Sequence, residues 1–140
     1  MTDTIMDPQK ARAADWFRNL RDEIVAAFET LETTQTTGPT ATLPASRFEV
    51  GETRRAGAAG EDAGGGLMSV MRNGRVFEKV GVNVSTVHGT LGARAQQAMA
   101  ARGVPGMDAD PRFWAAGISL VAHMQNPHCP AVHMNTRLFW

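Results

Sequence analysis

The strongest constraint on the fold of this 140-residue chain is the alternation of side chains between Gly117 and Phe139. Two runs of alternating polar and apolar residues flank the connection "MQNPHCP", in which Pro127 and Pro130 cannot donate to a strand ladder. Such alternation is typical of a strand with one buried face. The segment therefore predicts two antiparallel strands that share one apolar face and one polar face.

The predicted polar face carries an unusual set of side chains. It collects a hydroxyl, two imidazoles, an amide and a guanidinium, from Ser119, His123, His133, Asn135 and Arg137. The apolar face carries Ile118, Leu120, Ala122, Val132, Met134, Thr136 and Leu138. A turn centred on His128 would place His123 opposite His133. Ser119 would then lie opposite Arg137.

Three interpretations of this polar face remain open. A solvated sheet face is the simplest, although such faces usually carry Lys, Glu, Thr and Gln. A metal site is the second, since His123 and His133 could supply two imidazole ligands, but no neighbouring Cys pair or acidic residue completes a closed zinc site. The third is an anionic substrate: Arg137 can bind a carboxylate through two hydrogen bonds, and an imidazole can transfer a proton near neutral pH.

The N-terminal part of the chain has the pattern of one amphipathic helix. Asp7 and Pro8 form a helix-start signal, because aspartate can cap the first amide groups and proline needs no amide partner there. Apolar residues then recur at spacings of three and four: Ala13, Phe17, Leu20, Ile24, Phe28 and Leu31. We expect a helix from about Pro8 to Glu32, and then a Thr/Pro-rich loop.

A glycine cluster at Gly64–Gly66 comes after a strand-like run at residues 47–53. The cluster lacks the GxGxxG and GK[ST] patterns of phosphate loops. The next residues along the chain have a strand-like pattern, whereas phosphate loops usually open a helix. We therefore expect a flexible loop, or a lid over a site, rather than a nucleotide site.

The dipeptide Asn73-Gly74 lies between two apolar runs, which is the pattern of a hairpin with a two-residue type I′ turn. In that register Met71 would face Val76. Further strand structure is expected at residues 82–87, and a short helix at residues 93–102.

Composition argues against several classes of partner. The 14 basic and 14 acidic residues cancel, so nothing in the net charge favours nucleic acid or an anionic membrane. The longest apolar run, Trp114 to Ala122, is far shorter than the roughly 20 residues of a membrane-spanning helix, and no secretory signal is recognisable. The single cysteine, Cys129, precludes an internal disulfide and suits a reducing cytoplasm.

Two long segments closely resemble the oxygen-dependent coproporphyrinogen III oxidases of haem biosynthesis. They are "GGGLMSVMRNGRVFEKVGVNVSTVHG" and "FWAAGISLVAHMQNPHCPAVHMNTR", and the resemblance runs from about Phe48 to Phe139. It implies an α+β fold with a flat antiparallel sheet flanked by helices, and a cytoplasmic homodimer. It also implies oxidative decarboxylation of two propionates of coproporphyrinogen III to vinyls, giving protoporphyrinogen IX, with dioxygen as oxidant.

The resemblance also assigns roles to residues. It implies that His133 is the proton donor, that Ser119 contacts substrate, and that Asn135, Thr136 and Arg137 form a substrate-binding segment. His123 and His133 match positions proposed as metal ligands in some members. The resemblance implies no flavin, nicotinamide, haem or other organic cofactor, and leaves a divalent metal open.

Members of this family are considerably longer than 140 residues. We therefore expect residues 1–46 to form an N-terminal helix and loop, and residues 47–140 to form the N-terminal part of the oxidase domain, with an incomplete sheet. Three functions stay open: oxidase activity of the whole protein, a truncated non-catalytic fragment, and a histidine-based metal-binding module. Activity of the 140 residues alone is not expected.

Overall fold

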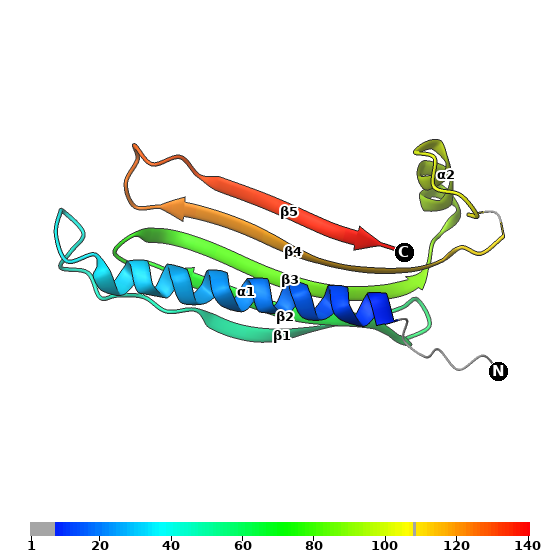
Figure 1. Cartoon of the computed structure of the whole chain (residues 1–140), viewed down its shortest axis with the longest axis horizontal. Coiled ribbons are helices and arrows are strands. Elements are labelled where there is room, and N and C mark those ends of the chain that lie inside the picture. The colour runs from blue at the N-terminus through cyan, green and yellow to red at the C-terminus, as the bar shows by residue number, and fades with distance from the viewer. Residues whose placement is uncertain (1–7, 108) are drawn as a thin grey trace.

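The computed structural model describes residues 8–107 and 109–140, and it shows one long helix that runs along one face of a five-stranded antiparallel sheet (Figure 1). The elements in chain order are α1 (Pro8–Thr34), β1 (Glu49–Ala56), β2 (Asp62–Arg72), β3 (Phe77–Thr90), α2 (Ala93–Ala101), β4 (Arg112–Met124) and β5 (Val132–Phe139). Each strand pairs with the next one in the chain, in the order β1-β2-β3-β4-β5. The predicted α+β class is confirmed.

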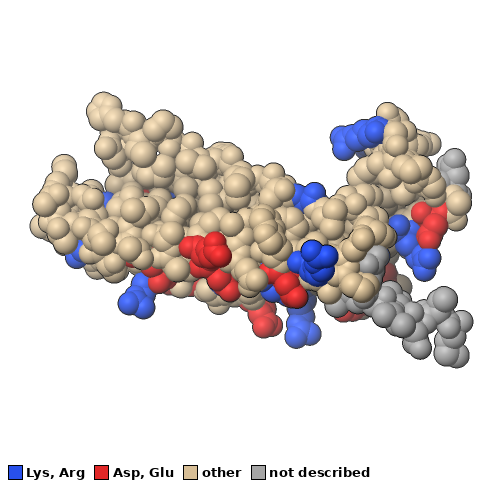
Figure 2. Space-filling view, viewed as in Figure 1, with Lys and Arg blue, Asp and Glu red and all other residues tan. Residues whose placement is uncertain are grey.

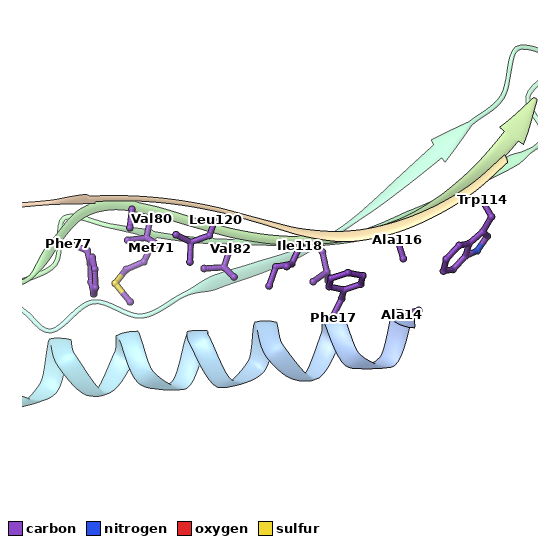
Figure 3. Packing of buried hydrophobic residues seen from close by; sticks show 12 residues of the cluster. Ala14, Phe17, Met71, Phe77, Val80, Val82, Trp114, Ala116, Ile118 and Leu120 are labelled. Carbon is purple, nitrogen blue, oxygen red and sulfur yellow. The ribbon is translucent and has the colours of Figure 1, made fainter. Parts of the chain in front are cut away.

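The hydrophobic core lies between α1 and the sheet, as Figure 3 shows from close by. Val80 and Val82 of β3 and Ile118 and Leu120 of β4 are buried on the side that faces the helix. Phe17 is the main buried aromatic residue that α1 contributes. Apolar residues at every second strand position meet a helix stripe of period 3.6, so the two sequence patterns account for this interface.

The predicted helix is confirmed, and it continues two residues past Glu32 to Thr34. The proposed cap Asp7 lies outside the described residues. The placement of Leu31 on the buried stripe is wrong, since its side chain is 47% exposed. The stripe rotates toward Glu32, one residue further on, which is fully buried.

Two charged residues of α1, Arg21 and Glu32, face the sheet and are buried, and each has specific partners. The Arg21 guanidinium donates from Nε and Nη2 to the buried hydroxyl of Ser69, at 3.0 and 2.8 Å, and it also pairs with Asp22. A buried charge is tolerated only where such partners satisfy it. These contacts fix the position of α1 along the sheet more tightly than apolar packing alone would.

The Glu32 carboxylate organises the connection between β2 and β3. It accepts backbone N–H groups from four residues at 2.7–3.0 Å, namely Ser46, Arg75, Val76 and Phe77. Burial by itself opposes ionisation of this carboxyl, but the four N–H donors outweigh that effect and hold the pKa of Glu32 below its ordinary value of 4.5.

The predicted two-residue turn at Asn73-Gly74 is therefore wrong in position. Asn73 does adopt a left-handed conformation, with φ of 53°, but Met71 pairs with Val80 rather than with Val76. Asn73 and Gly74 continue the pairing by donating backbone N–H groups to Glu78 and Phe77, and the amide groups of Arg75 and Val76, where the chain reverses, donate to Glu32. A tertiary contact has overridden a local turn preference.

The expected loop at Gly64–Gly66 is also wrong, since all three glycines lie inside β2 and pair with β3. A Cβ on Gly64 or Gly66 would strike the backbone of β3, and one on Gly65 would strike Thr53 of β1. Glycine is required here because the neighbouring strands approach so closely. The three glycines are thus part of the sheet and allow its strands to lie close together.

The helix α1 covers only one face of the sheet, and only part of that face. In Figure 1 β5 lies beyond the helix, at the edge of the sheet. Its helix-side residues Val132 and Met134 remain 47% and 38% exposed. In Figure 2 most of the charged side chains in view lie along the lower part of the molecule and at its right-hand end, and the upper left part of the surface is mostly uncharged.

Candidate functional site

The predicted polar face is on the side of the sheet opposite to α1. The pairing of β4 with β5 places Ser119 opposite Asn135, and Gly117 opposite Arg137. Their neighbours Ile118 and Leu120 are buried against the helix layer, so the alternate residues point the other way. The division of this hairpin into an apolar and a polar face is confirmed.

The predicted register of the hairpin is wrong by two residues. The turn begins at Asn126, whose carbonyl oxygen accepts the N–H of Cys129 and whose side-chain oxygen accepts the N–H of His128. This arrangement centres the turn on Pro127 instead of His128. Because side chains alternate with a period of two, a shift of two residues changes the partners and preserves the faces.

The two histidines of the polar face are in direct contact. Their Nε2 atoms are 3.2 Å apart, and the rings are stacked with centroids 5.4 Å apart at 20°. His133 lies opposite Val121, so it reaches His123 diagonally across the hairpin. One neutral ring can donate to the other, or both nitrogens can bind a shared cation.

The separation of the two Nε2 atoms also fits a pair of ligands on one metal ion. Two nitrogens at about 2.0–2.1 Å from a tetrahedral ion lie roughly 3.3 Å apart. However, residues 8–107 and 109–140 contain no group of three or more His, Cys, Asp and Glu side chains arranged to hold a metal. His123 and His133 could therefore supply at most part of a ligand set from within the described residues.

A row of hydrogen-bonding side chains crosses three strands on this face. Asn83 of β3 lies opposite Ser119 of β4, which lies opposite Asn135 of β5. Further along the same two strands, Lys79 lies opposite His123. Sequence reasoning did not assign Asn83 or Lys79 to the site, because it did not pair β3 with β4. The alternation of Asn83 with Val82 and Val84 was the available signal.

Arg137 and Thr136 differ in their placement. Gly117 stands opposite Arg137, and a Cβ on Gly117 would lie 2.6 Å from the carbonyl oxygen of Thr136 and 3.3 Å from Cβ of Arg137. The glycine lets β5 approach closely at this point. Thr136 lies opposite the buried Ile118, so its side chain is on the face that α1 partly covers and not beside Ser119 and Asn135.

The polar face is open in the described part of the chain. His123, His133, Asn135 and Arg137 are exposed, and Ser119 is half-buried. A cavity of about 560 Å³ lies on the other side of the sheet, where α1 and the strands diverge. It is lined in part by the core residues Trp114 and Ala116 and by His88, so it is separate from the His123–His133 pair.

Neither helix in the described ranges has the length and hydropathy that crossing a bilayer requires.

The chain is similar to proteins of one known family. Residues 12–140 match the family described as coproporphyrinogen III oxidase. The oxygen-dependent coproporphyrinogen-III oxidase of Rickettsia bellii strain RML369-C is 44% identical over 124 residues, which cover 89% of this chain and 40% of the relative. The enzyme of the same name from Rickettsia africae is 42% identical over 130 residues, covering 91% and 41%. The chain spans about two fifths of the length of these curated relatives.

Proposed function

Because the chain belongs to the coproporphyrinogen III oxidase family, we propose that the whole protein acts in haem biosynthesis by oxidising coproporphyrinogen III to protoporphyrinogen IX. The reaction converts two propionates to vinyls and uses dioxygen. In each conversion a propionate loses carbon dioxide and a hydride equivalent, and one dioxygen takes up those two electrons with two protons, which balances as hydrogen peroxide. No organic cofactor is part of the proposal.

The observation that carries this proposal is the gathering of the candidate residues on one open face of the sheet. Ser119, Asn135 and Arg137 bring a hydroxyl, an amide and a guanidinium beside the pair formed by His123 and His133. A guanidinium binds a carboxylate through two charge-assisted hydrogen bonds. A substrate with several propionates fits this chemistry better than a neutral ligand does.

Each residue has a proposed role. Arg137 binds a propionate, and Ser119 and Asn135 orient the substrate by hydrogen bonds. His133 is the proton donor, and its contact with His123 gives it a partner with which a proton can be exchanged. Thr136 would contribute to the substrate-binding segment through its backbone, since its side chain is on the other face.

A divalent metal is the second candidate, favoured by the 3.2 Å separation of the two Nε2 atoms. An ion held by His123 and His133, with further ligands from outside the described residues, would supply positive charge near the substrate carboxylates. A histidine-based metal-binding module without turnover would show the same pair. Activity that survives exhaustive chelation would argue against the metal.

Assembly and compartment belong to the same proposal. We expect the whole protein to form a homodimer in the cytoplasm, with residues 1–46 as an N-terminal helix and loop and residues 47–140 as the first part of the oxidase domain. Sedimentation of the full-length protein would test the dimer.

The decisive experiment replaces His133 in the full-length protein. His133→Ala should reduce the turnover of coproporphyrinogen III about 100-fold, the usual scale for a lost general acid. His128→Ala is the matched control, because His128 is an exposed histidine in the adjacent turn and should keep wild-type turnover. Wild-type turnover in His133→Ala would contradict the assigned proton donor, and no conversion by the wild-type protein would contradict the proposed function.

A further inference from the structure

We propose that Asn83 is a further substrate-contacting residue, which binds a second carboxylate of the tetrapyrrole and so fixes which propionate lies at His133. This inference rests on the proposed function, since it concerns the orientation of that substrate. Asn83 lies in the third strand of the sheet, one strand further from the edge than Ser119, and no site role was assigned to it from the sequence.

The amide of Asn83 is held in one orientation. Its Oδ1 accepts the backbone N–H of Ser69 on β2, at 3.2 Å. Since a backbone N–H can only donate, the oxygen end of the amide must face Ser69, and the NH₂ end is directed away from β2. No hydrogen bond from Nδ2 to a described residue is present, so its two donors are free to meet an acceptor above the sheet.

No side chain projects from the residue next to this NH₂ group, which is a glycine. Gly81 precedes Asn83 by two positions on the same face, and a Cβ built there would meet Asn83 Nδ2 at 3.7 Å, with no other atom within 4 Å. The amide NH₂ group therefore lies beside Gly81. Gly81 is opposite Val121 of β4, and Val121 is opposite His133 of β5. A larger residue at position 81 would occupy the space that a ligand needs to reach Nδ2.

The spacing of the strands decides what kind of ligand can use this donor. Asn83 on β3 and Arg137 on β5 are separated by two strand intervals, which is roughly 10 Å. At this backbone spacing, two separate carboxylates fit the two positions better than one does. A macrocycle that carries four propionates can place one at the guanidinium of Arg137 and another at the amide of Asn83. Binding at both points would define how the ring lies on the sheet and which propionate is beside His133.

The test uses two variants of the full-length protein. Asn83→Leu removes both the acceptor and the donors. Asn83→Asp keeps an oxygen for the Ser69 N–H but replaces the donors by a carboxylate, so the local fold is retained while ligand binding is lost. Thr86→Val is the control, because Thr86 lies on the other face of the same strand.

The main readout is the binding of two fluorescent porphyrins, measured by quenching of their emission. Coproporphyrin III carries four carboxylates, and mesoporphyrin IX carries two. Both Asn83 variants should weaken binding of the tetracarboxylate about 10-fold, the low end for a lost hydrogen bond to a charged group, and should weaken binding of the dicarboxylate less. In turnover, KM should rise more than kcat falls, and Thr86→Val should behave as wild type.

Other results would overturn the inference. If Asn83→Asp binds the tetracarboxylate as tightly as wild type, Asn83 does not contact ligand. The Asn83 variants could also bind both porphyrins more weakly by the same factor, in proportion to a fall in their Tm. In that case Asn83 has only a structural role. A wild-type protein that binds coproporphyrin III without converting coproporphyrinogen would contradict the proposed function alone, and the binding comparison would still decide the role of Asn83.

Discussion

The two faces of the sheet are built from the same strands and have opposite physical characters. On the face toward α1, Val82, Ile118 and Leu120 are at most 5% exposed and form the core. On the other face, His123, His133 and Arg137 are exposed to solvent. One face therefore holds the hydrophobic core, and the other carries the residues that we propose bind substrate. Substitutions on the two faces should therefore affect different measurements.

The largest effect should come from the closed face. Ile118→Ala should lower the free energy of unfolding by about 2–5 kcal/mol, because it leaves a cavity between β4 and α1. Val121→Ala is the matched control on the open face of the same strand: Val121 is 40% exposed, and its truncation should cost less than about 0.5 kcal/mol. Urea denaturation of the full-length variants measures both. Equal losses would mean that the two faces do not differ in this way.

The next largest effect should come from Glu32, the buried charge on the closed face. Glu32→Gln should lower the free energy of unfolding by roughly 1.5–3 kcal/mol, since an uncharged amide is a weaker acceptor for four backbone N–H groups. Glu29→Gln is the control, because the Glu29 carboxylate accepts the backbone N–H of Phe48 alone among the described residues, at 2.9 Å. A larger loss in Glu29→Gln would contradict this account.

The same carboxylate predicts a dependence of stability on pH. Because the pKa of Glu32 is lowered on folding, the folded state favours the ionised form. Its contribution is fully present above the ordinary value of 4.5 and is lost as the pH falls through the lower pKa of the folded state. Wild type should thus lose stability on acidification more steeply than Glu32→Gln. Parallel pH profiles of the two proteins would show that Glu32 does not contribute.

The smallest expected effect belongs to the open face, at Arg137. Arg137→Ala should weaken binding of coproporphyrin III about 10-fold and leave the unfolding transition unchanged, because the guanidinium is exposed and forms no ion pair with a described residue. Arg137→Lys should recover only part of the affinity, since an ammonium cannot form the paired hydrogen bonds of a guanidinium. A fall in Tm in both variants would assign Arg137 to stability instead.

The local sequence pattern was sufficient to predict the helices, most of the strands and which residues lie on each face of the β4–β5 hairpin. The helix from Pro8, the strands around Val82 and Ile118 and the short α2 were predicted because their periodicities are properties of neighbouring residues. Ser119, His123, His133, Asn135 and Arg137 were assigned to one face for the same reason. Their roles in catalysis are still proposals.

The errors in prediction occurred wherever residues distant in the chain decide the outcome. Gly64–Gly66 looked like a loop because close approach of β1 and β3 is not visible in a single segment. Asn83 was not grouped with Ser119 and Asn135 because the pairing of β3 with β4 was unknown.

The sequence by itself determined which side chains share a face of each strand, since alternation is fixed by backbone geometry and survives a shift of two residues. Only the tertiary structure decided the register and the positions of the turns. The carboxylate of Glu32 binds amide groups from residues 75–77, more than 40 positions away, so the chain turns there and not at Asn73-Gly74. A charged group that becomes buried must find its hydrogen-bond partners, and this requirement outweighs a local preference worth less free energy.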